Sequence, residues 1–308
     1  MTTNRTVTRG QSPILGLALL AAISFANLAH AQSAADVEPV PAPDKGIYNL
    51  FNPTPEALMR PLSTDRPDTT ESPFTVDAGH FQLEMSFFDL AYGRSSQDDQ
   101  PMRALRVAPM LIKCGVLDNL DVQLGIDPWS EEWNRDGTSG NGFGDMMLRV
   151  KLNLWGNDSF AEPGDTSFGL MPYATFPTAD SNLDDDTHFA WGLIAPLSVK
   201  LPGDCQAGAM AELDFTPAND AIGANGTTVS LLTSATVSFP VPVIEDLSMF
   251  VEYAGTAALN GDAQYAGYFD TGFTFLTNPN TQWDGGIRVG LTDGADEFAF
   301  FAGLSLRW

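Results

Sequence analysis

Few side chains in this sequence have the chemistry of a catalytic site. The 308 residues include three histidines and two cysteines, against 39 acidic and 15 basic residues. His80 could act as a general base, but no serine motif supplies a nucleophile for it to activate, so we expect no enzymatic activity. The glycines around Gly142 are not followed by a Lys-Ser or Lys-Thr pair, which argues against a phosphate-binding loop.

The densest group of potential metal ligands is the acid run Asp184, Asp185 and Asp186, with Asp180 and His188 beside it. Clustered carboxylates suit hard cations such as Ca²⁺. However, adjacent aspartates point apart along the chain, and the spacing is not that of an EF-hand loop. We therefore interpret the run as a solvated outer loop and expect neither a metal ion nor a cofactor.

The charge and composition exclude several classes of protein. With a net charge of −24, the chain has too few basic residues to neutralise a phosphate backbone, so nucleic acid is excluded as a partner. A hydrophobic content of 44% with 20 Phe excludes a disordered acidic protein. No apolar run reaches the roughly 18 residues of a membrane helix. Membrane strands remain compatible, because alternation dilutes their hydrophobicity.

The N-terminus has the features of an exported protein. Two arginines precede an apolar stretch at residues 14–23, and the small-residue site Ala29-His30-Ala31 follows. This arrangement predicts a signal peptide over residues 1–31. Residues 32–79 are rich in Pro, Ala and Asp without a sustained period, and they predict a periplasmic N-terminal segment.

From residue 80 to residue 308, apolar and polar residues alternate in about twelve runs, which indicates strands with two unlike faces. Each run is long enough for the tilted membrane strand of about 9–11 residues. We predict short turns at 113–119, 201–205, 240–246 and 277–280, and longer loops at 91–101, 128–143, 177–188, 217–226 and 255–267.

The apolar faces carry no charge in mid-strand, and large aromatic residues lie near strand ends, where a membrane interface favours them. We therefore predict an all-β fold, an antiparallel transmembrane β-barrel of about 12 strands over residues 80–308. Its apolar face would contact the lipid of the bacterial outer membrane. The alternative is a soluble periplasmic sandwich, which would bury that face instead.

The last strand has a distinctive end. Apolar residues alternate from Phe298 to a terminal aromatic residue, Trp308. Barrels of diderm bacteria typically close with such a strand, which the outer-membrane assembly machinery recognises. We expect Trp308 to be part of that assembly signal, with the assembly machinery as a partner.

Cys114 and Cys205 both fall beside predicted short turns at the periplasmic end, in an oxidising compartment. A disulfide between them would require the turns to fold over the lumen until the Cα atoms were about 4.4–6.8 Å apart. The sequence leaves a disulfide and two free thiols open as alternatives.

Several short motifs together resemble a known family. The most specific block is Ser63-Thr64-Asp65-Arg66-Pro67-Asp68-Thr69-Thr70-Glu71-Ser72-Pro73-Phe74, followed by Gly79-His80-Phe81-Gln82-Leu83-Glu84; shorter matches are Gly142-Phe143-Gly144-Asp145 with Lys151, Phe176-Pro177-Thr178, Glu252-Tyr253 and Asp284-Gly285-Gly286. Over residues 63–308 the chain resembles the outer-membrane proteins of the meta-pathway of phenol degradation family. The resemblance implies a β-barrel and a transport role, and it does not carry phenol over to this chain as a substrate.

The motif containing Asp65, Arg66 and Asp68 lies just before the first predicted strand. One interpretation is a turn in which Asp65 and Arg66 satisfy the local backbone and each other, with Pro67 setting the chain direction. The other is a segment whose charges dock in the barrel mouth and narrow it. We favour the local turn.

The strand alternation also predicts which charged side chains face the lumen. The predicted inward acids are Glu84, Asp121, Asp127, Asp145, Glu212, Asp214, Glu252, Asp270 and Asp284, and the predicted inward bases are Arg106, Arg149, Lys151, Lys200, Arg288 and Arg307. A barrel of about twelve strands is too narrow to hydrate them separately, so most should pair across the lumen.

These features favour an outer-membrane channel or transporter for small solutes, hydrophobic or aromatic ones included. The alternative membrane function is a plugged structural or adhesive barrel without transport. A third hypothesis is a soluble periplasmic β protein. Heat-modifiable gel migration would separate the soluble protein from the barrels, and single-channel conductance would separate the two barrels.

Overall fold

The computed structural model describes residues 44–93, 102–183, 189–219, 225–260 and 264–308. The predicted signal peptide and the acid run at residues 184–186 lie outside these ranges, as does His188. Within them, the structure contains no helix with the length and apolar character needed to cross a bilayer. One 3-10 turn, η1 (Glu56–Leu58), precedes the sheet.

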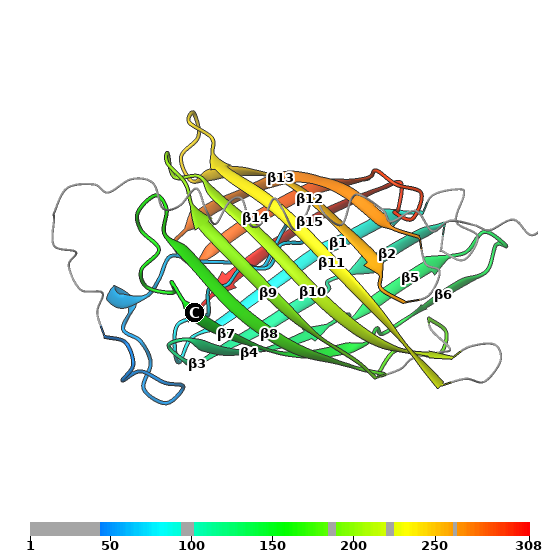
Figure 1. The fold of residues 1–308 in the computed structure, drawn as a ribbon, viewed down its shortest axis with the longest axis horizontal. Coiled ribbons are helices and arrows are strands. Elements are labelled where there is room, and N and C mark those ends of the chain that lie inside the picture. Colours follow the sequence, from blue (N-terminus) through cyan, green and yellow to red (C-terminus); the bar gives the residue numbers. More distant parts are fainter. Residues whose placement is uncertain (1–43, 94–101, 184–188, 220–224, 261–263) are drawn as a thin grey trace, which may run out of the picture. The chain divides into compact units, whose positions relative to one another are not determined.

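The described residues form a single antiparallel sheet that closes on itself (Figure 1). Its strands are β1 (Phe81–Tyr92), β2 (Arg103–Val107), β3 (Met110–Leu117), β4 (Leu120–Ile126), β5 (Trp129–Trp133), β6 (Ser139–Gly142), β7 (Met146–Trp155), β8 (Thr166–Phe176), β9 (Ala190–Lys200), β10 (Gln206–Asn219), β11 (Asn225–Pro240), β12 (Leu247–Ala258), β13 (Ala266–Asn278), β14 (Thr281–Gly290) and β15 (Phe298–Arg307). Apart from the broken strands described next, consecutive strands pair with each other. β1 also pairs with β15 from Gln82↔Arg307 to Tyr92↔Phe298, which closes the barrel.

The fifteen segments make twelve barrel strands, because three strands are interrupted. β2 and β3 are two parts of one strand that pair with successive halves of β1, and Ala108 between them has a φ of 56°. β4 and β5 continue one another in the same way, as do β6 and β7. Pro109 and Pro128 lack the N–H that a continuous ladder would need at the first two breaks. The predicted twelve-strand antiparallel barrel is confirmed.

The connections at the two ends of the barrel differ in length. At the end where the last strand finishes, most connections between neighbouring strands are short, at residues 118–119, 201–205, 241–246 and 279–280, and residues 156–165 form one longer connection. Longer connections such as 177–189 lie at the other end. We call the first end proximal; in outer-membrane barrels short turns face the periplasm. The predicted loop at 128–143 is corrected, because β5 and β6 occupy most of it, and the predicted turn at 113–119 begins too early.

The two faces of the sheet are chemically opposite. Large apolar side chains point outward and are exposed, among them Trp155, Trp191 and Trp283. Several stack across neighbouring strands, as Trp191 does on Phe215 at 4.1 Å between ring centroids. The inward face buries mainly polar and charged groups, together with a small apolar cluster around Met171 and single apolar residues such as Phe250. This inversion of a soluble fold is the arrangement expected of a barrel in lipid, and it excludes the soluble sandwich.

The terminal residue completes the seam between the first and last strands. Trp308 exchanges two backbone hydrogen bonds with Phe81, each 3.0 Å long, and its ring stacks on that of Phe81 at 6.2 Å. Its side chain is 60% exposed on the outer face. The outward face of the closing strand is therefore apolar as far as Trp308.

Deleting Trp308, or replacing it with Asp, should reduce insertion into the outer membrane, because it removes the terminal aromatic residue from the closing strand. The measurement is the yield of heat-modifiable barrel in the outer-membrane fraction. Trp283→Ala, which removes an outward tryptophan from within β14, is the matched control and should insert nearly normally. Normal yield after deletion of Trp308 would contradict an assembly role for this residue.

Candidate functional site in the barrel lumen

Residues 60–79, here called the lumenal loop, enter the barrel from the proximal end. The hydroxyls of Ser63 and Ser72 lie 2.6 Å apart, and the Ser72 N–H donates to Asp65 Oδ1 at 3.0 Å. These contacts close residues 63–72 into a compact turn of chain. Asp65 is 8% exposed, and beyond its contact with Ser72 within the loop it binds side chains of strands on the barrel wall.

The Asp65 carboxylate is the most heavily bonded group in the lumen. Lys113 Nζ and Arg149 Nη2 bind its Oδ2 at 2.6 and 2.9 Å, and Lys151 Nζ binds its Oδ1 at 2.6 Å. The three cationic side chains come from β3 and β7 and are at most 3% exposed. An anion with three cationic partners away from water is strongly stabilised, and the cations depend on it equally.

Two acids of the lumenal loop, three residues apart, have opposite protonation behaviour. Burial opposes ionisation of Asp65, but its three cationic neighbours hold the pKa of that carboxyl well below its usual range. Burial, together with the neighbouring Glu252 carboxylate, raises the pKa of the Asp68 carboxyl well above its usual range. A carboxyl group whose pKa is lowered by folding stabilises the folded state at pH values above that pKa. The contribution of Asp65 to the stability of the fold is therefore lost only as the pH falls through its lowered pKa.

On the opposite wall of the barrel, the lumenal loop donates hydrogen bonds to acidic side chains. Glu252 and Asp270 are directly opposed on β12 and β13, an unfavourable position for like charges. The backbone N–H groups of Thr69 and Thr70 donate to Glu252 at 2.7 and 2.8 Å. Arg288 binds Asp270 at 2.9 Å. The loop therefore supplies an anion to the basic wall and N–H donors to the acidic wall.

Arg66 anchors the loop tip to β14 and β1. Its guanidinium binds Asp284 on β14 at 2.7 Å and also donates to the Ser86 hydroxyl. Gly303 on β15 makes room for this side chain, because a Cβ at that position would overlap the Arg66 guanidinium. A glycine in the middle of the closing strand is thus explained by the loop that lies against it.

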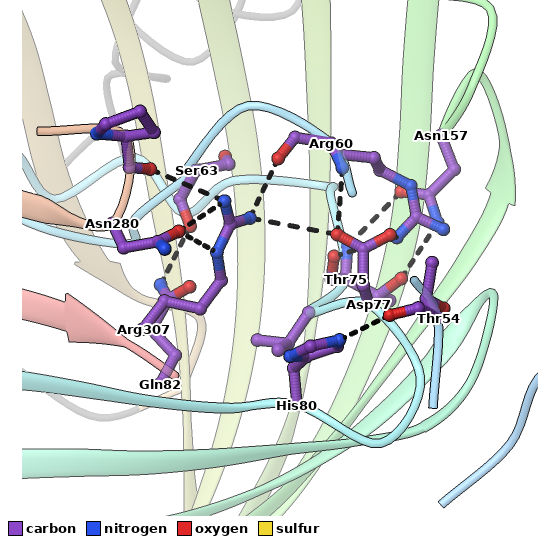
Figure 2. A network of polar contacts seen from close by, with 12 residues as sticks. Thr54, Arg60, Ser63, Thr75, Asp77, His80, Gln82, Asn157, Asn280 and Arg307 are labelled. Carbon is purple, nitrogen blue, oxygen red and sulfur yellow. Dashed lines mark hydrogen bonds and ion pairs between the residues drawn. The ribbon is translucent and has the colours of Figure 1, made fainter. Parts of the chain in front are cut away.

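A second ionic centre holds the base of the loop at the proximal end (Figure 2). Asp77 accepts the Arg60 backbone N–H at 2.9 Å and pairs with Lys45 at 3.1 Å and Arg307 at 3.7 Å. Arg307 in turn donates to the Arg60 carbonyl at 2.8 Å. Gly115 on β3 lets the backbone at Asp77 pass, since a Cβ there would overlap the Asp77 carbonyl.

Beyond the loop, toward the distal end, the barrel encloses a cavity of about 740 Å³. Residues of the loop tip (Arg66, Pro67 and Asp68) form part of its lining. Its described acidic lining residues are Asp68, Asp89, Asp127, Glu131, Glu132, Asp145 and Asp296, and its basic ones are Arg66, Arg106 and Arg288. The lumen thus has a negatively biased vestibule that ends at the loop.

The structure places the predicted charged residues in four locations. Around the loop it brings together Glu84, Asp121, Arg149, Lys151, Glu252, Asp270, Asp284, Arg288 and Arg307. Glu212 and Asp214 on β10 lie apart and contact the Tyr173 hydroxyl, each at 2.7 Å. Arg106, Asp127 and Asp145 line the cavity, and Lys200 pairs with Asp204 near the proximal turn.

Two expectations from the sequence are corrected. Asp65 and Arg66 bind barrel side chains, so the local-turn interpretation is wrong and the docked segment is observed. Several ion pairs run from the barrel wall to the lumenal loop, where pairing across the lumen between strands was expected. Of the two alternatives left open for Cys114 and Cys205, the structure has free thiols.

Sequence reasoning missed Lys113, because the predicted turn at 113–119 removed it from its strand. The alternation of Ile112, Cys114 and Val116 as apolar neighbours would have placed Lys113 on the inward face. Among the described residues, no group of three or more His, Cys, Asp or Glu side chains is arranged to hold a metal ion.

Comparisons with known proteins extend this description. A family model described as "Putative MetA-pathway of phenol degradation" matches residues 64–308. No curated protein matches the sequence. Among solved structures, an outer-membrane channel from Pseudomonas putida F1 is similar with a TM-score of 0.56 at 14% identity, over 80% of this chain and 100% of that one.

Two further solved structures are more distant. The NanC porin matches at 10% identity with a TM-score of 0.48, over 73% of this chain and 98% of that one. The CymD monoaromatic hydrocarbon channel matches at 9% identity with a TM-score of 0.40, over 74% and 87%. At 14% identity, the similarity to the Pseudomonas putida F1 structure supports the barrel fold of this chain.

Replacing Asp65 with Asn should destabilise the protein by about 3–5 kcal/mol, because it leaves buried cations without their anion. The measurement is denaturant unfolding of the purified barrel in micelles at neutral pH. Asp68→Asn is the matched control in the same loop. Since burial already favours the neutral form of Asp68, its replacement should cost less than about 1 kcal/mol. Equal losses in the two variants would contradict the central role of Asp65.

Proposed function

The chain belongs to the family described as "Putative MetA-pathway of phenol degradation", and we propose that this outer-membrane β-barrel is a channel for small solutes, narrowed partway along its lumen by the lumenal loop. Solutes would enter the vestibule at the distal end and pass the loop to reach the periplasm. We include hydrophobic and aromatic solutes, for which Phe301 in the vestibule lining offers a contact surface. Transport, and not catalysis, is the proposed activity.

The single observation that carries this proposal is the 740 Å³ cavity leading to a loop that is held mainly by polar contacts. The loop tip is bound through ion pairs and hydrogen bonds of Asp65, Arg66, Thr69 and Thr70. Such contacts can be exchanged for water or solute more readily than interlocked apolar packing, which would lose its driving force on exposure. The neighbour from Pseudomonas putida F1, described as an outer-membrane channel, supports the same function.

A plugged structural barrel is the second candidate, and the completeness of the ionic contacts favours it. Asp65 alone engages three cations, and Asp77 engages three more. A loop bound this firmly could fill and rigidify the barrel without ever moving. Conductance decides between the two candidates.

In planar bilayers the wild-type protein should give small but discrete single-channel currents. Deleting residues 62–74 should increase the conductance roughly several-fold, because it removes the narrowing while leaving the strands intact. Heat-modifiable migration should show that the deleted variant still forms a barrel. A wild type that never conducts, beside a deletion variant that does, would favour the plugged barrel.

The open channel should prefer cations modestly, because acids outnumber bases in the vestibule lining. The preference should fade with salt, since the Debye length is about 10 Å at 0.1 M ionic strength. The measurement is the reversal potential in a KCl gradient. Glu131→Gln with Asp296→Asn should reduce it, whereas the matched pair Asp204→Asn with Glu245→Gln, in proximal turns, should not. Anion selectivity in the wild type would contradict the assignment.

A further inference from the structure

The three cations around Asp65 form a complete carboxylate-binding site on the barrel wall. We propose that Lys113, Arg149 and Lys151 bind the carboxylate group of a small solute, and that Asp65 occupies their site as an internal ligand until such a solute replaces it. This inference rests on the proposed channel function and names a class of solute for it, small monocarboxylates.

The geometry fits a carboxylate group. Four donors approach the two oxygens of Asp65 in pairs: Lys113 and Arg149 on one oxygen, Lys151 and the Ser72 N–H on the other, all at 2.6–3.0 Å. Three of the four donors belong to the wall. Pairs of donors on each oxygen are the arrangement that a planar, singly charged group satisfies and a spherical anion does not.

Barrel residues hold Lys113 and Arg149 in position, and Arg149 also binds Glu71 of the loop through its Nη1 at 2.6 Å. Glu84 on β1 pairs with Lys113. Gln123 on β4 accepts a hydrogen bond from Arg149 Nε at 2.6 Å, and its own amide donates to Asp121 at 2.7 Å. These partners are barrel residues, so the site would keep its shape when the loop withdraws.

Charge balance requires an anion once the loop withdraws and takes its two acids near the cluster, Asp65 and Glu71, away from the cations. The wall cluster then contains three cations against the two carboxylates of Glu84 and Asp121, an excess of one positive charge on side chains that are at most 3% exposed. A buried cation without a counter-ion is strongly unfavourable. A monocarboxylate restores the balance that Asp65 provided, and neither a neutral solute nor a cation can do so.

The cation preference of the vestibule and the capture of a carboxylate at this site are separate properties. Acids in the vestibule slow the approach of any anion, and salt screens that effect. The proposed carboxylate site lies past the loop tip, and the groups that line it are the three cations of the barrel wall. A solute that combines a carboxylate with an apolar body would be held at the wall by its charged end.

The test uses purified full-length barrel in which every variant carries Glu71→Gln, so that no other loop acid neutralises Arg149, and Asp65→Ala in this background empties the site. Acetate should raise the Tm of this variant by about 5–10 °C at 100 times its Kd. Acetamide, which has the same shape without the charge, should raise it little, and chloride at equal ionic strength should not reproduce the shift. Asp68→Ala is the matched control from the same loop and should not respond to acetate.

Adding Lys151→Gln to Asp65→Ala should reduce the acetate effect at least tenfold in apparent affinity. A response equal for acetate and acetamide, or an equal response in Asp68→Ala, would overturn the proposal, and a full response to chloride would show a general anion site instead. If Asp65→Ala does not fold, Asp65→Ser, which also removes the carboxylate and leaves space for acetate, takes its place in the same titration. Because the readout is binding, a barrel that binds acetate without conducting would refute only the channel, and one that conducts without binding would refute only the carboxylate site.

Discussion

Compensation of buried charge inside a narrow barrel is the constraint on which the rest of this structure depends. The inward face of the sheet places Lys113, Arg149 and Lys151 on one wall and Glu252 and Asp270 on another. Too little water fits there to hydrate these groups singly, so each must find a partner or be neutral. The lumenal loop provides partners for both walls at once, through a carboxylate on one side and backbone N–H groups on the other.

This constraint explains why the loop is polar and how it is fixed. Its tip is held by Asp65 and Arg66, and its base by the ionic centre at Asp77 shown in Figure 2. Inward glycines at 115 and 303 leave space for its backbone and for the Arg66 guanidinium. The wall and the loop are therefore complementary in shape as well as in charge.

The outer surface obeys the opposite requirement, since lipid can neither hydrate nor pair a charge. Apolar side chains cover this surface, and tryptophans near the strand ends stack on aromatic neighbours. The outward face of the closing strand is apolar as far as Trp308. The three strand breaks near residues 108, 127 and 144 are confined to consecutive strands on one side, next to the vestibule. The wall is thus most irregular where the cavity lies.

The sequence by itself determined the barrel, its strand number and the inward position of residues such as Glu84 and Arg149, because alternation with a period of two is a local property of each strand. The insertion of the loop and the partners of its charges were decided only by the tertiary structure. Asp65 meets Lys113, Arg149 and Lys151 across 48, 84 and 86 residues of chain. Those three cations come together when β3, β4 and β7 pair, and Asp65 reaches them only when the loop enters the lumen. No local pattern encodes where a closed lumen will bring a preceding segment.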